Sequence, residues 1–91
     1  MPDAQRTNVT VAATNAYWNF QRRAAQALAR GQDPVEIQQE LDTISDRQYH
    51  RAQDRVMLMT GRRPTPEQSQ EFWNINTNQR LGAREVLAHI I

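Results

Sequence analysis

The sequence predicts an all-α protein of three helices, folded as an antiparallel up-down-up bundle or as an extended helical hairpin. Its 91 residues include only three Gly and four Pro, whereas a small β protein needs frequent tight turns. Ala, Gln, Arg and Glu are abundant, and these residues favour helices. Apolar residues also recur at helical spacing between recognisable helix ends. We expect a chain of this length to form one domain, residues 1–91.

The first predicted helix covers about residues 9–30 and follows a lead-in of about seven residues. Thr7, Asn8 and Thr10 are candidate caps for its start, and Gly31 suits the position just after its end. The apolar stripe is rich in alanine, which would let a neighbouring helix approach closely. The stripe consists of Val9, Ala13, Ala16, Tyr17, Phe20, Ala24, Ala27 and Leu28.

The second predicted helix covers about residues 34–60. Asp33 is a suitable cap, Pro34 occupies the first turn, and Gly61 follows the last turn. Its apolar stripe consists of Ile37, Leu41, Ile44, Ala52, Val56 and Met59, with Tyr49 at the edge.

The third predicted helix covers about residues 66–90. Thr65 and Gln68 have the spacing of a capping box at its start. The polar run 74–78 and Gly82 weaken the helix, so the sequence allows a break into two pieces near residues 74–82. Its apolar stripe consists of Phe72, Ile75, Ala83, Val86, Leu87 and Ile90.

Three polar residues, Gln48, Asn76 and Gln79, interrupt these stripes. The favoured interpretation places them at the rim of the core, in contact with water. The alternative is a polar layer between helices, whose members would have to bond one another and would fix the helix register. Mean hydropathy is low, at −0.83, so the core is either thin or completed by another chain.

Several kinds of chemistry are disfavoured by the residues present. The chain has no Cys, which excludes disulfides, thiolate metal sites and Cys nucleophiles. His50 and His89 belong to no recognised catalytic or metal-binding motif, and the three glycines are isolated. We therefore expect no catalytic site, no cofactor, no metal and no small-molecule substrate.

No apolar run approaches the roughly 20 residues that cross a bilayer, and the first residues do not resemble a secretory signal. We expect a cytoplasmic protein without a membrane partner, although secretion without a signal stays open.

Trp18 is the strongest pointer to a binding surface. It lies about 160° around the first helix from Phe20, the centre of the stripe, at 100° per residue. Val11, Ala25 and Ala29 fall on the same line, so this helix has a second apolar face. Such a face could pack on another part of the same chain, or it could bind a partner. The second alternative is favoured because interface hot spots are enriched in Trp and Arg. The predicted partner-binding residues are Val11, Trp18, Arg22, Ala25, Ala29, Trp73, Arg62 and Arg63.

All eleven basic residues are Arg, although the net charge is only +1. Arg47, Arg51 and Arg55 recur every four residues along one ridge, and Arg62 and Arg63 follow in the next turn. The ridge could follow a phosphate backbone, but bases at the end of a helix are also favoured by the helix dipole.

The sequence therefore predicts a small non-enzymatic module that binds a partner protein or itself, acting as an adaptor, inhibitor or accessory subunit. The alternative function is a nucleic-acid-binding regulator that uses the Arg ridge.

Overall fold

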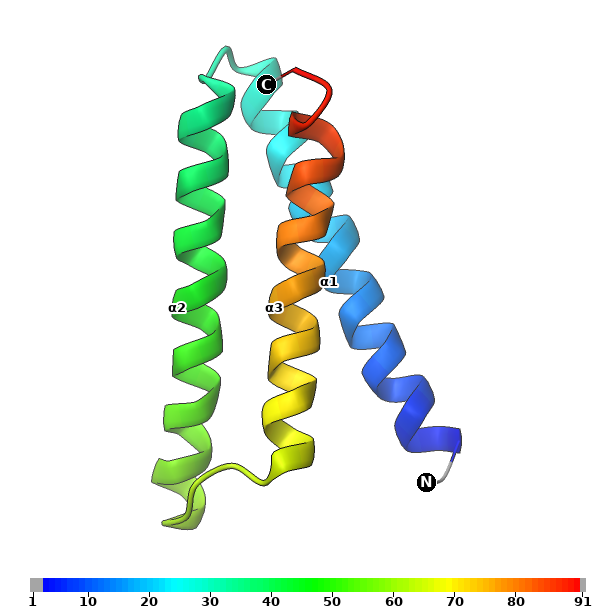
Figure 1. Ribbon diagram of the computed structural model, residues 1–91, viewed down its shortest axis with the longest axis vertical. Coiled ribbons are helices and arrows are strands. Elements are labelled where there is room, and N and C mark those ends of the chain that lie inside the picture. Colours follow the sequence, from blue (N-terminus) through cyan, green and yellow to red (C-terminus); the bar gives the residue numbers. More distant parts are fainter. Residues whose placement is uncertain (1–2, 91) are drawn as a thin grey trace.

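Three helices make up the computed structural model, which describes the backbone of residues 3–90 and the side chains of residues 11–90. They are α1 (Asp3–Ala29), α2 (Pro34–Thr60) and α3 (Pro66–Leu87). The chain runs up, down and up, so α2 is antiparallel to both of its neighbours (Figure 1). The described residues form no strand, and the predicted all-α three-helix class is confirmed. None of these helices is long and apolar enough, over the described residues, to cross a membrane.

The first helix begins earlier than predicted. Residues 3–8, most of the expected lead-in, are helical, and the candidate caps Thr7, Asn8 and Thr10 therefore lie inside α1 and do not cap its start. The predicted stripe position Val9 lies outside the described side chains. The end of the helix is as predicted: Gly31 has φ of 85°, and its N–H donates to the Leu28 carbonyl at 2.9 Å. The next N–H, that of Gln32, donates to the Ala27 carbonyl at 3.2 Å, which completes a Schellman motif.

The other helix ends also follow from local chemistry. Asp33 Oδ2 accepts from the Glu36 N–H at 3.2 Å, which caps the start of α2. Gly61, with φ of 70°, ends α2 by donating its N–H to the Met57 carbonyl. At the start of α3, the Gln68 N–H donates to Thr65 Oγ1, and the Thr65 N–H donates back to Gln68 Oε1. The predicted capping box is thus present.

The third helix is continuous from Pro66 to Leu87, so the break allowed near residues 74–82 does not occur. Tertiary contacts offset the weak local propensity of this segment. Asn76 is buried against α2, and Gly82 is buried against α1. The helix ends before the predicted residue 90, and Ile90 is 55% exposed, outside the core.

The core lies at the end of the molecule that holds the α1–α2 turn, because the buried apolar residues come from the halves of the helices that meet there (Figure 1). These residues are Phe20, Ala24, Ala27, Ile37, Leu41, Ala83 and Leu87, with Leu28, Ile44 and Val86 packed against them.

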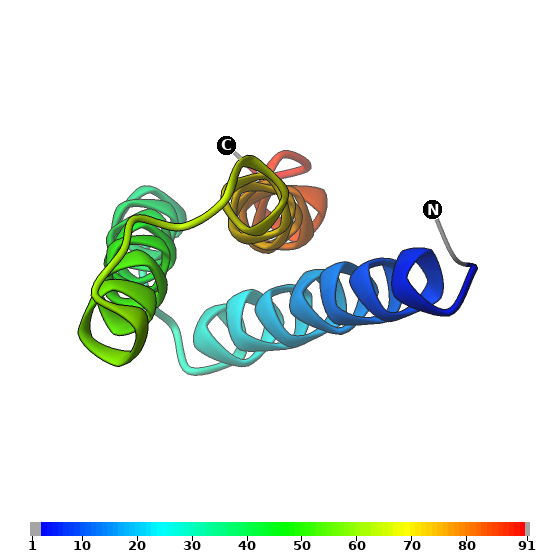
Figure 2. The same ribbon diagram turned by 90° about the horizontal axis from the view of Figure 1, so that it is seen from below.

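Towards its N-terminus α1 crosses α3 and points away from α2 (Figures 1 and 2). The far ends of α2 and α3 therefore lack α1 as a third partner. This explains why Met59, expected in the core, is 79% exposed, and why its neighbour Leu58 is 87% exposed.

Gly82 lies directly against the backbone of α1. A Cβ atom at this position would lie 2.1 Å from the carbonyl oxygen of Tyr17, so the two backbones touch. Ala16, Ala24 and Ala83 are buried, and Ala24 and Ala83 belong to the same core cluster. The expectation that alanines on the first helix permit a close approach therefore agrees with the packing.

Candidate protein-binding surface

The second apolar face of α1 is open to solvent. Trp18 is 55% exposed, whereas Phe20 on the core side is 3% exposed. Val11 is 50% exposed, and Ala25 and Ala29 are exposed on the same line. The ring of Tyr17 meets Trp18 edge-on, with 5.2 Å between the centroids. The described part of the chain thus leaves more than half of Trp18 uncovered, as a binding role would require.

Leu81 of α3 is a further half-exposed apolar residue, which the sequence analysis did not single out. It is 50% exposed and precedes Gly82, whose contact on α1 is Tyr17, the neighbour of Trp18. Leu81 also points away from the buried side of α3, since Ala83 on that side is 1% exposed. Its position relative to Trp18 depends on how α1 crosses α3, so the stripe of α3 alone could not predict it. We call the exposed set Val11, Trp18, Ala25, Ala29 and Leu81 the Trp18 strip.

Arg22 adjoins the Trp18 strip because it follows Trp18 by four residues on the same helix, and it is exposed. The remaining predicted partner-binding residues lie elsewhere. Trp73 precedes Gly82 by nine residues, roughly 13 Å along the helix axis, and packs edge-on against Tyr49 of α2 at 5.8 Å. Arg62 and Arg63 belong to the α2–α3 turn, which lies at the end of the molecule opposite to the α1–α2 turn (Figure 1).

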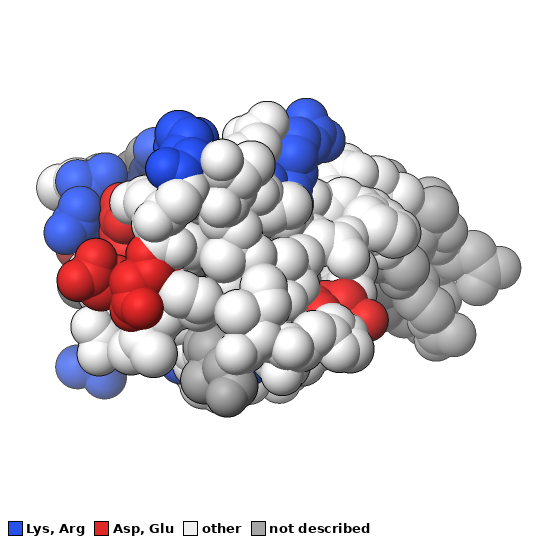
Figure 3. All heavy atoms as spheres, turned by 90° about the horizontal axis from the view of Figure 1, so that it is seen from above, with Lys and Arg blue, Asp and Glu red and all other residues white. Residues whose placement is uncertain are grey.

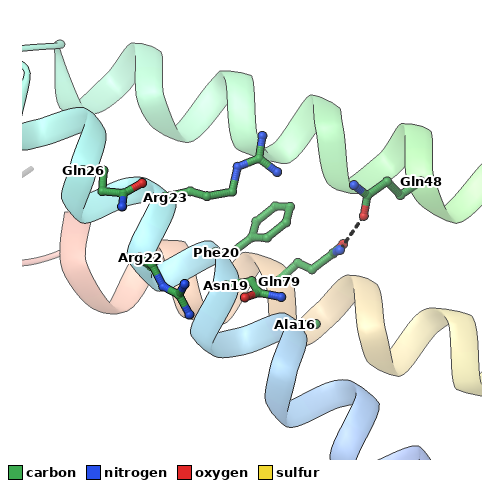
Figure 4. A pocket seen from close by; sticks show the side chains of 8 residues that line it. All are labelled: Ala16, Asn19, Phe20, Arg22, Arg23, Gln26, Gln48 and Gln79. Carbon is green, nitrogen blue, oxygen red and sulfur yellow. Dashed lines mark hydrogen bonds between the residues drawn. The ribbon is translucent and has the colours of Figure 1, made fainter.

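A shallow depression of about 380 Å³ lies beside Arg22, between α1 and α2 (Figure 4). Its lining contains two guanidinium groups, four side-chain amides and no carboxylate. The Arg23 guanidinium lies 5.3 Å from the centroid of the Phe20 ring, a favourable cation–π distance. The lining residues are Ala16, Asn19, Phe20, Arg22, Arg23, Gln26, Gln48 and Gln79.

A polar layer between α2 and α3 adjoins this depression through Gln48 and Gln79. Ser45, Asn76 and Gln79 are 0%, 4% and 6% exposed, so the rim placement favoured for Asn76 and Gln79 is wrong. Asn76 Nδ2 donates to Ser45 Oγ at 2.8 Å, and Ser45 Oγ donates to Gln79 Oε1 at 2.9 Å. Gln79 Nε2 donates in turn to Gln48 Oε1 at 2.6 Å, although Gln48 itself is exposed. Ser45 was missed by the sequence reading because it lies beside Ile44 at the edge of the α2 stripe.

Two ion pairs join α2 to α3. Arg80 pairs with Asp46, and Arg84 Nη2 lies 3.9 Å from Asp42 Oδ2. The hydrogen bond from Arg80 lowers the pKa of Asp46 below its ordinary value of 3.8, and a second hydrogen bond from Asn76 acts in the same direction. Both carboxylates are therefore directed towards α3.

The Arg ridge of α2 remains exposed. Arg47, Arg51 and Arg55 are exposed, as are Arg62 and Arg63 in the turn, and none of the five forms an ion pair with the described residues. Figure 3 views the molecule from the end that holds the α1–α2 turn. On this face, arginine side chains lie along the margins and the carboxylates form separate groups.

The two histidines are exposed, and the ring of His50 packs beside Tyr49 at 5.5 Å. Within residues 11–90, whose side chains are described, no group of three or more acidic or histidine side chains is arranged to hold a metal ion. Comparison with protein-family models, with curated proteins and with solved structures gives no match for this chain.

Proposed function

We propose that this protein is a small protein-binding module, an adaptor, inhibitor or accessory subunit, that docks its Trp18 strip against another protein. One observation carries the proposal: Trp18 is 55% exposed on the side of α1 opposite to the core residue Phe20. More than half of this side chain thus lies outside the packing of the described residues. Large aromatic side chains are the commonest anchors of protein interfaces. The proposal assigns the protein no catalytic group, cofactor or metal, and places its action in the cytoplasm.

The strip has the composition of an interface centre. Val11 on α1 and Leu81 on α3 are each half-exposed, and the small side chains of Ala25 and Ala29 would let a partner helix approach the backbone of α1. Covering Trp18 fully would contribute roughly 2–4 kcal/mol to binding, the range of an interface hot spot. Arg22 at the edge would select partners by charge.

The matched pair Trp18→Ala and Trp73→Ala tests the proposal. Both tryptophans are 55% exposed, but they lie on different parts of the surface. The protein and both variants would be used to capture partners from cells of the source organism, and each captured protein would then be titrated in purified form. We expect Trp18→Ala to weaken binding at least tenfold, and Trp73→Ala to leave it unchanged.

Circular dichroism would show whether each variant is folded, and Leu81→Arg would provide a second disruption of the strip that leaves Trp18 in place. If a purified partner binds Trp18→Ala and Leu81→Arg as tightly as the original protein, the Trp18 strip is not the docking surface.

The exposed Arg ridge favours a second candidate function, binding of nucleic acid by Arg47, Arg51, Arg55, Arg62 and Arg63. Its support is the orientation of Asp42 and Asp46 towards α3, which leaves the ridge without carboxylate partners among the described residues. Affinity for duplex DNA or RNA would then fall steeply with salt, because arginines on phosphates release counterions. Replacing Arg51 and Arg55 by Gln should abolish that binding, while Arg30→Gln on α1 should not. Absence of salt-sensitive binding at about 50 mM salt would eliminate this candidate.

A further inference from the structure

We propose that the partner of the Trp18 strip presents a carboxylate, from an Asp or Glu beside an apolar side chain. The carboxylate enters the depression lined by Arg22 and Arg23, while the apolar side chain covers Trp18. This inference rests on the proposed function and names the chemistry of the partner.

The charge of the depression suits an acidic ligand. The eight residues that line the depression include two arginines and no acid. Neither Arg22 nor Arg23 forms an ion pair with the described part of the chain, whereas Arg80 and Arg84 both do. A guanidinium binds a carboxylate through two parallel N–H···O bonds, so an acidic side chain is the natural occupant.

Two side chains of the depression, Arg23 and Gln79, have partners within the fold before a ligand arrives. Arg23 stacks on the Phe20 ring, which restricts its guanidinium. Gln79 is buried and bonded to Ser45 and Gln48, so it is fixed by the polar layer. Gln48 uses its oxygen to accept from Gln79 (Figure 4), and its amide N–H₂ group has no acceptor among the described residues. Fixed N–H donors around a site favour an acceptor-only group such as a carboxylate.

The strip and the depression are contiguous through Arg22. This residue lines the depression and also follows Trp18 by one helical turn. A partner helix carrying an acid three or four residues from an apolar side chain would therefore reach both regions at once. A nucleic-acid backbone would satisfy the arginines but would gain nothing from Trp18, Val11 and Leu81, which are half-exposed apolar groups. The observations thus favour a peptide segment as the occupant.

Selection from a random peptide library displayed on phage tests the inference without a known partner. The immobilised protein would be the original chain, Trp18→Ala, the double variant Arg22→Gln/Arg23→Gln, or the control Arg62→Gln/Arg63→Gln, which removes the same charge far from the depression. We expect the original chain and the control to enrich peptides in which Asp or Glu lies within four residues of a large apolar residue. A selected peptide should bind Arg22→Gln/Arg23→Gln about tenfold more weakly or worse, and its own Glu→Gln version should lose affinity to the same degree.

The outcomes separate this inference from the function on which it rests. Peptides that require Trp18 but show no acid preference, or that bind Arg22→Gln/Arg23→Gln unchanged, would overturn the carboxylate inference and leave the docking surface intact. Selection that yields no Trp18-dependent peptide would overturn both. Concentration-dependent self-association that is lost in Trp18→Ala, measured by sedimentation, would identify a second copy of this chain as the occupant and would also overturn the inference.

Discussion

Gly82 is the residue whose role changes most between the sequence and the structure. Read along the chain it weakens a helix, but in the fold it lets α3 touch the backbone of α1 at Tyr17. A methyl group there would lie 2.1 Å from the Tyr17 carbonyl oxygen, and a backbone atom cannot move aside without moving its helix.

We expect Gly82→Ala to destabilise the protein by about 1–3 kcal/mol, even though Ala is the better helix former by about 1 kcal/mol. Chemical denaturation would measure the change. The control Glu85→Ala, at an exposed position of α3, should stay within about 0.5 kcal/mol of the original chain. A Gly82→Ala variant as stable as the original would contradict the close contact.

Ser45 supports the polar layer with a single hydroxyl group. It donates to Gln79 Oε1 and accepts from Asn76 Nδ2, and it is completely buried. Ser45→Ala should cost about 1–3 kcal/mol in the free energy of unfolding, because it removes the hydroxyl that donates to the buried Gln79 Oε1 and accepts from Asn76 Nδ2.

Thr43 provides the matched control for this change. Its hydroxyl is exposed and donates only to the carbonyl of Gln39 in its own helix. Thr43→Ala should therefore change thermal stability little. Equal effects of the Ser45 and Thr43 replacements on the unfolding midpoint would argue against an energetic role for the layer.

Between elements, the α2–α3 contact combines the polar layer with surface ion pairs, and one of these pairs makes stability depend on pH. Arg80 holds the pKa of Asp46 below its ordinary value of 3.8. The carboxylate therefore stabilises the fold above that value, and this contribution disappears as the pH falls through the lowered pKa. Because Asp46 is half-exposed, the contribution at neutral pH is at most about 1 kcal/mol.

We expect Asp46→Asn to be less stable than the original chain at pH 7, with the difference shrinking as the pH falls below 3.8. Urea unfolding across this range would measure the difference. Asp54→Asn is the control, since Asp54 is exposed and forms no ion pair with the described residues. A difference for Asp46→Asn that stays constant with pH would show that Arg80 does not stabilise the ionised form.

Over the whole molecule, packing is uneven along the long axis. The described residues of α2 after Ser45, and those of α3 before Asn76, include none that is buried. The apolar core instead lies at the end near the α1–α2 turn, where all three helices meet. The far end of the α2–α3 hairpin is therefore held mainly by half-buried contacts such as Tyr49 on Trp73.

Hydrogen exchange should follow this gradient. We expect slow exchange for amides in residues 37–45 and 79–87, and faster exchange in residues 52–60 and 68–75, because local opening costs least where little apolar surface is buried. Mass spectrometry of the exchanged protein would resolve these segments. Uniform protection along α2 would contradict the gradient, and so would better protection at its C-terminal end.

The sequence by itself determined the number of helices, most of their ends and the outward direction of Trp18. These features depend on local chemistry: Asp33 and Thr65 cap their own helices, Gly31 and Gly61 adopt positive φ, and Trp18 lies opposite Phe20 on one helix. Only the tertiary structure decided which polar residues are buried, that Gly82 is a contact and that Leu81 joins the Trp18 strip. Those features depend on where one helix crosses another, and a crossing is set by side-chain packing between segments far apart in the sequence.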